Sequence, residues 1–480
     1  MNKFVRGTFV SFFCLGFSVL LGCGGSQFTG SLTGRDGGDG TGPQPAKGQA
    51  QVTSLSPSTI AAAAPSFTLT VTGLNFVPTT TVMWDTTPLT TTYVSSTVLQ
   101  AQVPTALLGI PGSTESITPS PVGTFNYGVN FAITAPQLDG NKSFTVSKSA
   151  VQANDMVWSP SDSRFYLAVS SRDTSKPNTV TSLDPQSGLF GSSIPTGSNP
   201  AKLAISADGA YLYASLNDSS AVQRYTLPAL QSDITIPLGV GSSPNYFASD
   251  LQVQPTNSHA LAVARMASNT NYPDQGDVVI YDDTTPRAQT TSSPTNLKIN
   301  ELLWNTNGQN LYGITSIAAI NLYIMSVDST GLQIKTSPGI TASLNGGLHF
   351  DSPTGYIYSD DGIVLDPQNA GLVANFPLGA LQSGLNSGSL MIPDSKLNTA
   401  YFLGRTIDGP GPGNYVIEAF DLTHFNLLGT ASIPNVSGTP YRFVRWGSNG
   451  LAFLTTDSNG TGAAGGVYLV SGDFVTSPAP

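Results

Sequence analysis

Short segments that alternate hydrophobic and polar residues, separated by turn residues, fill most of this chain. The clearest run spans residues 197–230. Within it, apolar or alternating stretches at 203–205, 211–214 and 221–225 are separated by the turn sequences SADG and NDSS. Glycine takes positive φ in a turn at no steric cost, and period-two alternation is typical of a half-buried strand. With a fourth stretch at 233–236, the run predicts a four-stranded antiparallel meander.

The first strand of this unit recurs along the C-terminal two-thirds of the chain. Each copy has an apolar residue, any residue and a large apolar residue before a turn. The seven copies begin at Met156, Leu203, Leu251, Leu302, Leu348, Leu390 and Val444, about 42 to 54 residues apart. Three of the four tryptophans, Trp158, Trp304 and Trp446, occupy the third slot, where they are expected to pack between neighbouring units. Seven such units predict a seven-bladed β-propeller.

A spare strand before the first copy is expected to close the ring. The last copy offers only three strands before the chain ends in SPAP, whereas residues 144–146 form an extra apolar strand. An unpaired sheet edge is a template for unwanted association, and propellers protect their edges. We therefore expect residues 144–146 to pair with the last blade.

Aspartate ends several of the third strands, at Asp184, Asp282, Asp328, Asp366 and Asp421. A repeated set of carboxylates is one way to hold a metal ion. However, Asp side chains also accept hydrogen bonds from backbone amides two residues on, and Asp before Pro or Gly is a turn signal. We therefore favour turn initiation and expect no metal at these positions.

The repeats resemble the YVTN family of seven-bladed β-propellers. The best correspondence lies at residues 194–225, with IPTGSNP followed by SADGAYLYAS. The resemblance covers residues 138–480 and implies a fold rather than an activity. Blades three to six match less closely, so their strand boundaries are harder to place.

Residues 51–135 form a separate domain of short alternating strands. Strands are expected at 67–73, 81–84 and 98–104, with Pro and Gly turns between them, as in an antiparallel sandwich. Trp84 is a potential ligand platform, but we favour a core aromatic. The order SLSPST, LTVTGLNF, VMWDTTPL resembles the IPT/TIG immunoglobulin-like family. We expect this domain to fold independently of the propeller, because the connection at 135–141 is short and polar.

Composition agrees with an all-β exported protein. Only 10% of the 480 residues are charged, while the chain has 50 Gly and 34 Pro. The net charge of −10 repels phosphate backbones, so nucleic acid is not an expected partner. The only two cysteines, Cys14 and Cys23, precede the folded part, so no Cys-based metal site and no cofactor are expected there.

The N-terminus reads as an export signal followed by a lipidation site. Lys3 and Arg6 precede an apolar run of about 13 residues, which is too short to span a membrane. The sequence then reads LLGC, which resembles the lipobox of bacterial lipoproteins, with residues 1–22 as signal peptide and Cys23 lipidated. An ordinary secretory signal is the alternative. Gly24 after the cysteine implies, by that resemblance, the outer membrane, and residues 23–50 read as a Gly-rich flexible tether.

Candidate chemistry is sparse. The chain has three histidines, and no metalloprotease, nucleophile-elbow or phosphate-loop motif is found. Some propellers are lyases or lactonases that use histidine near the axis, and only His349 lies on an innermost strand. A lone histidine on a strand is more often structural, so we assign no catalytic residue.

Six polar residues at the innermost strands remain as a candidate binding set. Three residues before the large apolar residue of the repeat lie Asp155, Lys202, Asp250 and Glu301, and equivalent positions on different blades point towards one mouth of the axial channel. His349 and Arg445 lie one residue before that large apolar residue. Together these side chains would line a polar funnel, although we favour the alternative that they are solvated surface charges.

The sequence thus predicts a monomeric, non-catalytic lipoprotein of the bacterial cell envelope. A lipid anchor holds it at the membrane, facing either the periplasm or the exterior, and the propeller binds protein or glycan. Two alternatives remain open: a lyase- or lactonase-type enzyme acting at the axial funnel, and a structural component of the envelope.

Overall fold

The computed structural model describes residues 49–62, 64–108, 114–120, 128–134, 144–239, 245–269, 272–291, 298–315, 321–336, 347–369, 371–378, 381, 389–405, 414–448, 450–456 and 465–475. The predicted signal peptide, Cys23, nearly all of the tether and the connection at 135–141 lie outside these residues. Across the described ranges, no helix has the length and apolar character to cross a membrane. Regular helix is limited there to three 3-10 turns, η1 (Thr105–Leu107), η2 (Asn217–Ser219) and η3 (Asp473–Val475).

The N-terminal domain is a β-sandwich of two sheets. One sheet has the order β1-β3-β7-β6, and its strands are β1 (Gln51–Ser56), β3 (Phe67–Leu74), β7 (Val98–Val103) and β6 (Thr90–Ser95). The other has the order β2-β9-β8-β4-β5, with β2 (Thr59–Ala61), β9 (Val129–Thr134), β8 (Thr114–Ser120), β4 (Thr81–Trp84) and β5 (Thr87–Pro88). The strands predicted at 67–73, 81–84 and 98–104 are confirmed, whereas β2, β5 and β6 were not foreseen.

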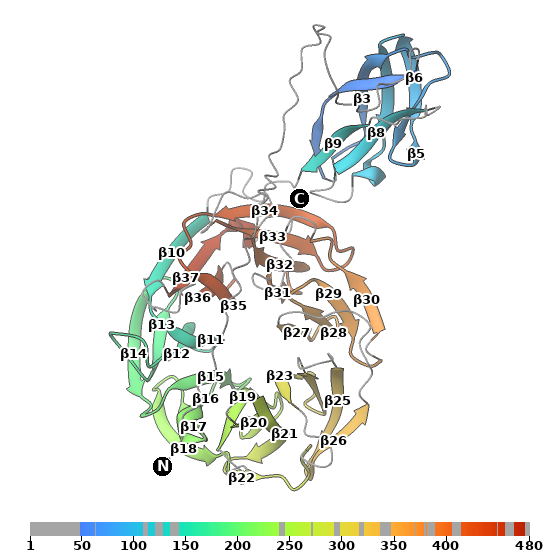
Figure 1. Cartoon of the computed structure of the whole chain (residues 1–480). Coiled ribbons are helices and arrows are strands. Elements are labelled where there is room, and N and C mark those ends of the chain that lie inside the picture. The colour runs from blue at the N-terminus through green and yellow to red at the C-terminus, as the bar shows by residue number, and fades with distance from the viewer. Residues whose placement is uncertain are drawn as a thin grey trace, which may run out of the picture. The chain divides into compact units, whose positions relative to one another are not determined.

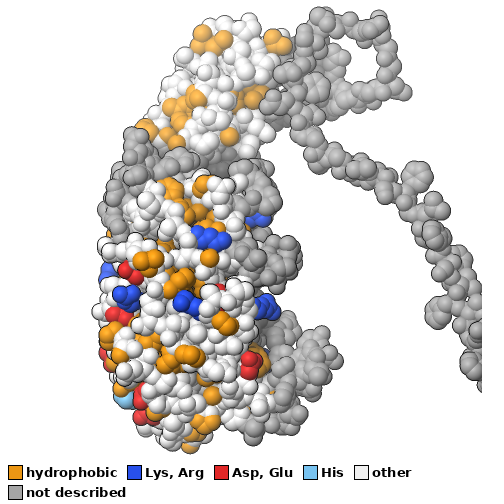
Figure 2. Space-filling model, turned by 90° about the vertical axis from the view of Figure 1, so that its left-hand side faces the viewer, with side chains coloured by type: hydrophobic (Ala, Val, Ile, Leu, Met, Phe, Trp, Pro, Cys, Tyr) orange, Lys and Arg blue, Asp and Glu red, His pale blue; other side chains and the backbone are white. Residues whose placement is uncertain are grey.

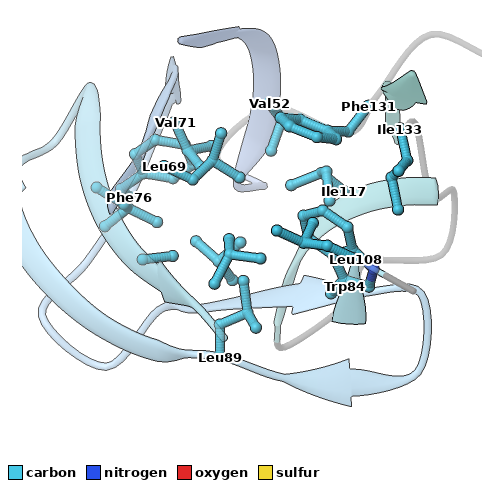
Figure 3. Close-up of a cluster of buried hydrophobic side chains, with 14 of the residues drawn as sticks. Val52, Leu69, Val71, Phe76, Trp84, Leu89, Leu108, Ile117, Phe131 and Ile133 are labelled. Atoms are coloured by element: carbon cyan, nitrogen blue, oxygen red, sulfur yellow. The ribbon is translucent and has the colours of Figure 1, made fainter. Parts of the chain in front are cut away.

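Alternation along these strands builds the core of the sandwich. Leu69 and Val71 of β3 are fully buried, whereas Thr68, whose side chain points to the other face of the sheet, is exposed. Trp84 is 3% exposed, and its ring centroid lies 5.0 Å from that of Phe131, which is on β9 of the same sheet. Figure 3 shows both side chains among the buried hydrophobic residues. Trp84 is therefore a core aromatic, as the sequence favoured.

The C-terminal domain is a seven-bladed β-propeller (Figure 1). In the described residues from 144 onward, seven four-stranded sheets are arranged around a centre. From the inside outward, blade one consists of β11 (Ala153–Ser159), β12 (Arg164–Val169), β13 (Thr179–Asp184) and β14 (Leu189–Pro195). Blade two consists of β15 (Pro200–Ile205), β16 (Tyr211–Leu216), β17 (Ala221–Thr226) and β18 (Gln231–Pro237). Blade three consists of β19 (Tyr246–Val253), β20 (Ala260–Asn269), β21 (Tyr272–Asp282) and β22 (Thr285–Pro286).

The remaining blades follow the same order and end in a composite sheet. Blade four consists of β23 (Ile299–Trp304), β24 (Asn310–Thr315), β25 (Asn321–Asp328) and β26 (Gly331–Thr336). Blade five consists of β27 (Leu348–Asp351), β28 (Tyr356–Ser359), β29 (Ile363–Asp366) and β30 (Gly371–Asn375). Blade six consists of β31 (Leu390–Asp394), β32 (Thr399–Gly404), β33 (Tyr415–Asp421) and β34 (Leu427–Ile433). Blade seven is β35 (Thr439–Trp446), β36 (Gly450–Thr456), β37 (Gly466–Gly472) and β10 (Phe144–Ala150).

The predicted closure of the ring is confirmed. β10 pairs antiparallel with β37 along its whole length, from Phe144 opposite Gly472 to Ala150 opposite Gly466. The ring of Phe144 lies 5.3 Å from that of Phe474, centroid to centroid. All seven predicted innermost segments also lie on the innermost strands of their blades.

Tryptophans in the third slot pack between blades, as predicted. The ring of Trp446 in blade seven lies 6.1 Å from that of Trp158 in blade one, and the indole N–H of Trp304 in blade four donates to the carbonyl of Gln252 in blade three, 3.2 Å away. Neighbouring blades thus cover both faces of the middle strands. This is why the third strand at 221–225, expected to be half-buried, has even Arg224 only 4% exposed.

Most aspartates that end third strands start turns. Asp184, Asp328, Asp366 and Asp421 each accept a hydrogen bond from the backbone N–H two residues on, at 2.8 to 2.9 Å. Turn initiation is therefore confirmed at these four positions. Asp282 differs, because its carboxylate forms a two-pronged ion pair with Arg287.

Glu418 on β33 is a buried carboxyl group inside blade six. It is 4% exposed, and burial raises its pKa from 4.5 to about 7. Below pH 4.5 the folded and unfolded chains are both protonated at this residue. As the pH rises to 7, Glu418 loses its proton in the unfolded chain before it does so in the folded chain. The free energy of unfolding therefore falls by at most about 3 kcal/mol.

We therefore expect Glu418→Gln to stabilise the propeller at pH 8 by about 1–3 kcal/mol and to leave its stability unchanged at pH 4. Calorimetric melts of both proteins between pH 4 and pH 8 measure the difference. Destabilisation of the variant at every pH would instead mean that the ionised carboxylate is paired.

Candidate functional site

A β-bulge recurs near the start of the innermost strands. The pairing register shifts between Ala153 and Asp155 in blade one, and at corresponding places in β15, β19, β23 and β35. A bulge leaves one residue unpaired and re-aims the side chains around it. In blade three the bulged Ser249 donates its hydroxyl to the carbonyl of Ile299 on the next blade, 2.7 Å away.

An acid follows the bulge in blades one, three and four, and it links its blade to the next one. Asp155 Oδ2 accepts from the backbone N–H of Leu203 at 2.9 Å, Asp250 Oδ2 from that of Leu302 at 2.8 Å, and Glu301 Oε2 from that of Leu348 at 2.9 Å. Hydrogen bonds to ionised groups contribute about 1.5–3 kcal/mol each. The candidate acids therefore have a structural role that the sequence did not reveal.

Blade five makes the same link with a residue from a different position. Asp360 lies in the turn between β28 and β29, and its Oδ1 accepts from the backbone N–H of Met391 on blade six at 2.7 Å. Its Oδ2 accepts from the N–H of Gly347 at 2.6 Å. The Nε2 of His349 lies 3.0 Å from Oδ1 of Asp360, so this carboxylate also orients the histidine ring.

These residues surround a cavity of about 260 Å³ on the axis of the ring. Every blade contributes to its wall. The cavity therefore lies at the centre of the ring that the innermost strands form in Figure 1. The lining residues are Asn154, Asp155, Lys202, Asp250, Gln252, Asn300, Glu301, Gly347, His349, Asp360, Leu390, Met391, Tyr441, Arg442 and Phe443. The cavity is therefore polar on most sides, with an apolar segment from blades six and seven.

Arg442 on β35 is the principal cation of the cavity. Its Nε lies 3.1 Å from Oδ1 of Asp155, and its side chain is 40% exposed although the residue lines an axial cavity. The carboxylate of Asp155 raises the pKa of Arg442, and those of Asp250, Glu301 and Asp360 act in the same direction. Arg442 is thus a permanent positive charge among four carboxylates.

Two of these carboxylates are harder to ionise than usual. Burial raises the pKa of Glu301 to about 7, and the nearby charge of Asp250 pushes it the same way. Burial also raises the pKa of Asp250, against the opposing effect of Lys202. Near neutral pH the wall therefore carries less negative charge than its four acids suggest.

Five of the six candidate residues line this cavity, namely Asp155, Lys202, Asp250, Glu301 and His349. The sixth is a correction, because Arg445 is not in the lining. Its Nε lies 2.7 Å from Asp394 of blade six, and its other nitrogens donate to backbone carbonyls such as that of Gly450. The two faces of an inner strand face two different blades, and Arg445 lies on the opposite face of β35 from Arg442.

Arg442 and Asp360 were missed for identifiable reasons. Arg442 follows its bulge as Asp155 does, but blade seven has one more residue between the bulge and the third-slot tryptophan. Counting back from Trp446 therefore gives Phe443 instead. Asp360 comes from an outer turn, so no inner-strand pattern could find it. The other two histidines, His259 and His424, pair with Asp283 and Asp421 away from the cavity.

No cluster suited to a metal ion is found in the described parts of the chain. Charged side chains on the propeller surface are few, and on the face visible in Figure 2 they lie scattered among neutral ones. The axial cavity, in contrast, brings charged groups of opposite sign together.

A family model matches the N-terminal domain. Residues 50–150 match the family model of the IPT/TIG domain. No curated protein matches the chain. Among solved structures, the β-propeller domain of Myceliophteria thermophila Cps50 (Swd1) is 14% identical over 68% of this chain and 99% of its own, with a TM-score of 0.48. The RRP9 WD40 repeats are 13% identical over 71% and 99%, also with a TM-score of 0.48. At such identities the likeness concerns the fold alone, and residues 50–150 are similar to IPT/TIG domains.

Proposed function

We propose that this chain is a lipid-anchored protein of the bacterial envelope whose propeller is a non-catalytic binding module for protein or glycan. The anchor part rests on the LLGC sequence ending at Cys23 and on the export signal before it. The propeller is of the YVTN type by its repeat sequences. Tether, immunoglobulin-like domain and propeller follow one another, which is a suitable order for presenting a binding module away from a membrane.

The observation that carries the binding role is the polar cavity to which all seven blades contribute. Ligand sites are concave, largely preformed and lined by a few convergent polar groups. Here the carboxylates are already held in place by backbone N–H groups of the next blade, such as Leu203 and Leu302. The wall is therefore rigid before any ligand arrives, which lowers the entropic cost of binding.

An enzyme acting at the same cavity is the second candidate, favoured by one observation. The pKa of Glu301 is raised to about 7, a value suited to a general acid or base at neutral pH, and His349 lies near it in the same wall. The Glu301 carboxylate is also a blade-to-blade link, however, and a structural role explains its position equally well.

Binding and catalysis are separated by one set of measurements on the soluble chain 24–480. We expect saturable binding on arrays of envelope glycans and envelope proteins, with bound glycans recovered intact by mass spectrometry. Glu301→Gln retains an oxygen that can accept from Leu348 N–H, so the variant should fold, and no cleavage product is expected from it or from the unsubstituted chain.

Two outcomes would contradict this proposal. Cleavage of a lactone or glycan that is lost in Glu301→Gln or His349→Ala would make the protein an enzyme. Absence of saturable binding on both arrays would leave a structural role in the envelope.

A further inference from the structure

The cations of the axial cavity have donors that remain available. In the described structure, Arg442 bonds only through Nε, which approaches Asp155 and the carbonyl of Met156, and neither terminal nitrogen has a partner. The ammonium group of Lys202 likewise has no hydrogen-bond or ion-pair partner among the described residues, although its charge is felt by Asp250. A guanidinium fork with two open nitrogens is suited to bidentate recognition.

Acceptors in the same wall are fixed and only partly used. Glu301 bonds to the backbone through Oε2, so its Oε1 remains for a ligand. In His349, Nε2 faces Asp360, and the other ring nitrogen has no partner in the described structure. The wall thus offers donors and acceptors side by side, which is the arrangement that a hydroxyl group needs, because it both donates and accepts.

The balance of charge argues against an ionic ligand. An anion would meet the carboxylates of Asp155 and Asp360, and a cation would meet Arg442 and Lys202. Like charges brought together in a cavity are costly, because they are only weakly screened there. A neutral molecule with several hydroxyl groups would satisfy both kinds of partner and meet no repulsion.

Size and shape narrow the ligand further. A cavity of about 260 Å³ lies near the lower end of the range for ligand pockets, about 300 Å³, which suits a ligand of one ring. Leu390, Met391 and Phe443 form an apolar segment of the wall. The C–H face of a sugar ring packs on such a surface while its hydroxyl groups bond on the other side.

We propose that the axial cavity binds one neutral sugar ring, free or at the end of a glycan, with Arg442 as the principal recognising residue. This inference rests on the binding role proposed above and names its ligand class. The terminal nitrogens of Arg442 donate to a pair of neighbouring hydroxyl groups, and Glu301 accepts from a third.

The test uses the whole soluble chain 24–480 and two matched variants on β35. Arg442→Lys keeps the positive charge that the four carboxylates need but removes the fork. Arg445→Lys makes the same chemical change at a residue outside the cavity. The probes are a panel of neutral mono- and disaccharides, with glucuronate and glucosamine as charged analogues, measured by calorimetric titration and ligand-observed NMR.

We expect at least one neutral sugar to bind more tightly than its charged analogues. Its affinity should fall at least about tenfold in Arg442→Lys and stay unchanged in Arg445→Lys. The site is wrong if no neutral sugar binds at 10 mM, if a charged analogue binds tenfold more tightly, or if Arg442→Lys leaves the affinity unchanged. Binding to a protein or glycan that Arg442→Lys does not alter would overturn this site alone and leave the broader binding role intact.

Discussion

Cys23→Ala should release the protein from the membrane fraction almost completely. Cys23 is the proposed lipid attachment point. The net charge of −10 gives no general attraction to anionic lipids. Acyl chains would then be the attachment, since each buried CH₂ contributes about 0.8 kcal/mol. Fractionation of cells that express either form, followed by immunoblotting, measures the effect.

The control for this experiment is Cys14→Ala, which removes the other cysteine and should leave membrane retention unchanged. Mass spectrometry of the purified N-terminal peptide should find lipid only when Cys23 is present. If Cys23→Ala still sediments with membranes after a high-salt wash, the lipobox interpretation is wrong.

A propeller that lacks β10 should be severely destabilised. β10 pairs with β37 over seven residues, and the Ser149 hydroxyl donates to the carbonyl of Gly188 in blade one at 2.7 Å. At about 1 kcal/mol net for each hydrogen bond, the strand contributes roughly 5–7 kcal/mol. Its loss also exposes the edge of β37, which can then pair with other chains.

The comparison is between a chain that begins at residue 142 and one that begins at residue 151. The first should melt cooperatively, and the second should melt at least about 10 °C lower or form aggregates. Differential scanning calorimetry and size-exclusion chromatography report the two effects. Equal melting temperatures would mean that β10 adds no stability to blade seven and that other contacts close the ring.

The order of strands could be predicted from the sequence because it depends on local patterns. Alternation, turn residues and a repeat of about 42 to 54 residues can be read from neighbouring positions, and blades one to six pair only consecutive strands. Even the closure at 144–146 followed from counting strands in the last copy, because a strand deficit at one end and a surplus at the other have one simple solution. The third-slot tryptophans marked the faces where blades pack.

The axial site was accessible to this reasoning only in part. Equivalent positions on successive inner strands face the same channel, and the position three residues before the large apolar residue identified Asp155, Lys202, Asp250 and Glu301. In blade seven the same count gives Phe443 and misses Arg442, because the bulge there lies one residue further from Trp446. The position one residue before the large apolar residue identified His349 correctly but also gave Arg445, whose side chain pairs with Asp394 instead.

The sequence by itself thus determined the fold class, the seven blades and their closure, since short-range periodicity sets which residues form strands and which face is buried. Only the tertiary structure decided what the polar residues do. Whether Glu301 is a solvated charge, a catalytic group or a link to Leu348 depends on atoms 47 positions away in the chain, and its raised pKa depends on burial by other blades. Asp360 joined the cavity from an outer turn for the same reason: long-range packing brings together residues whose sequence neighbourhoods have nothing in common.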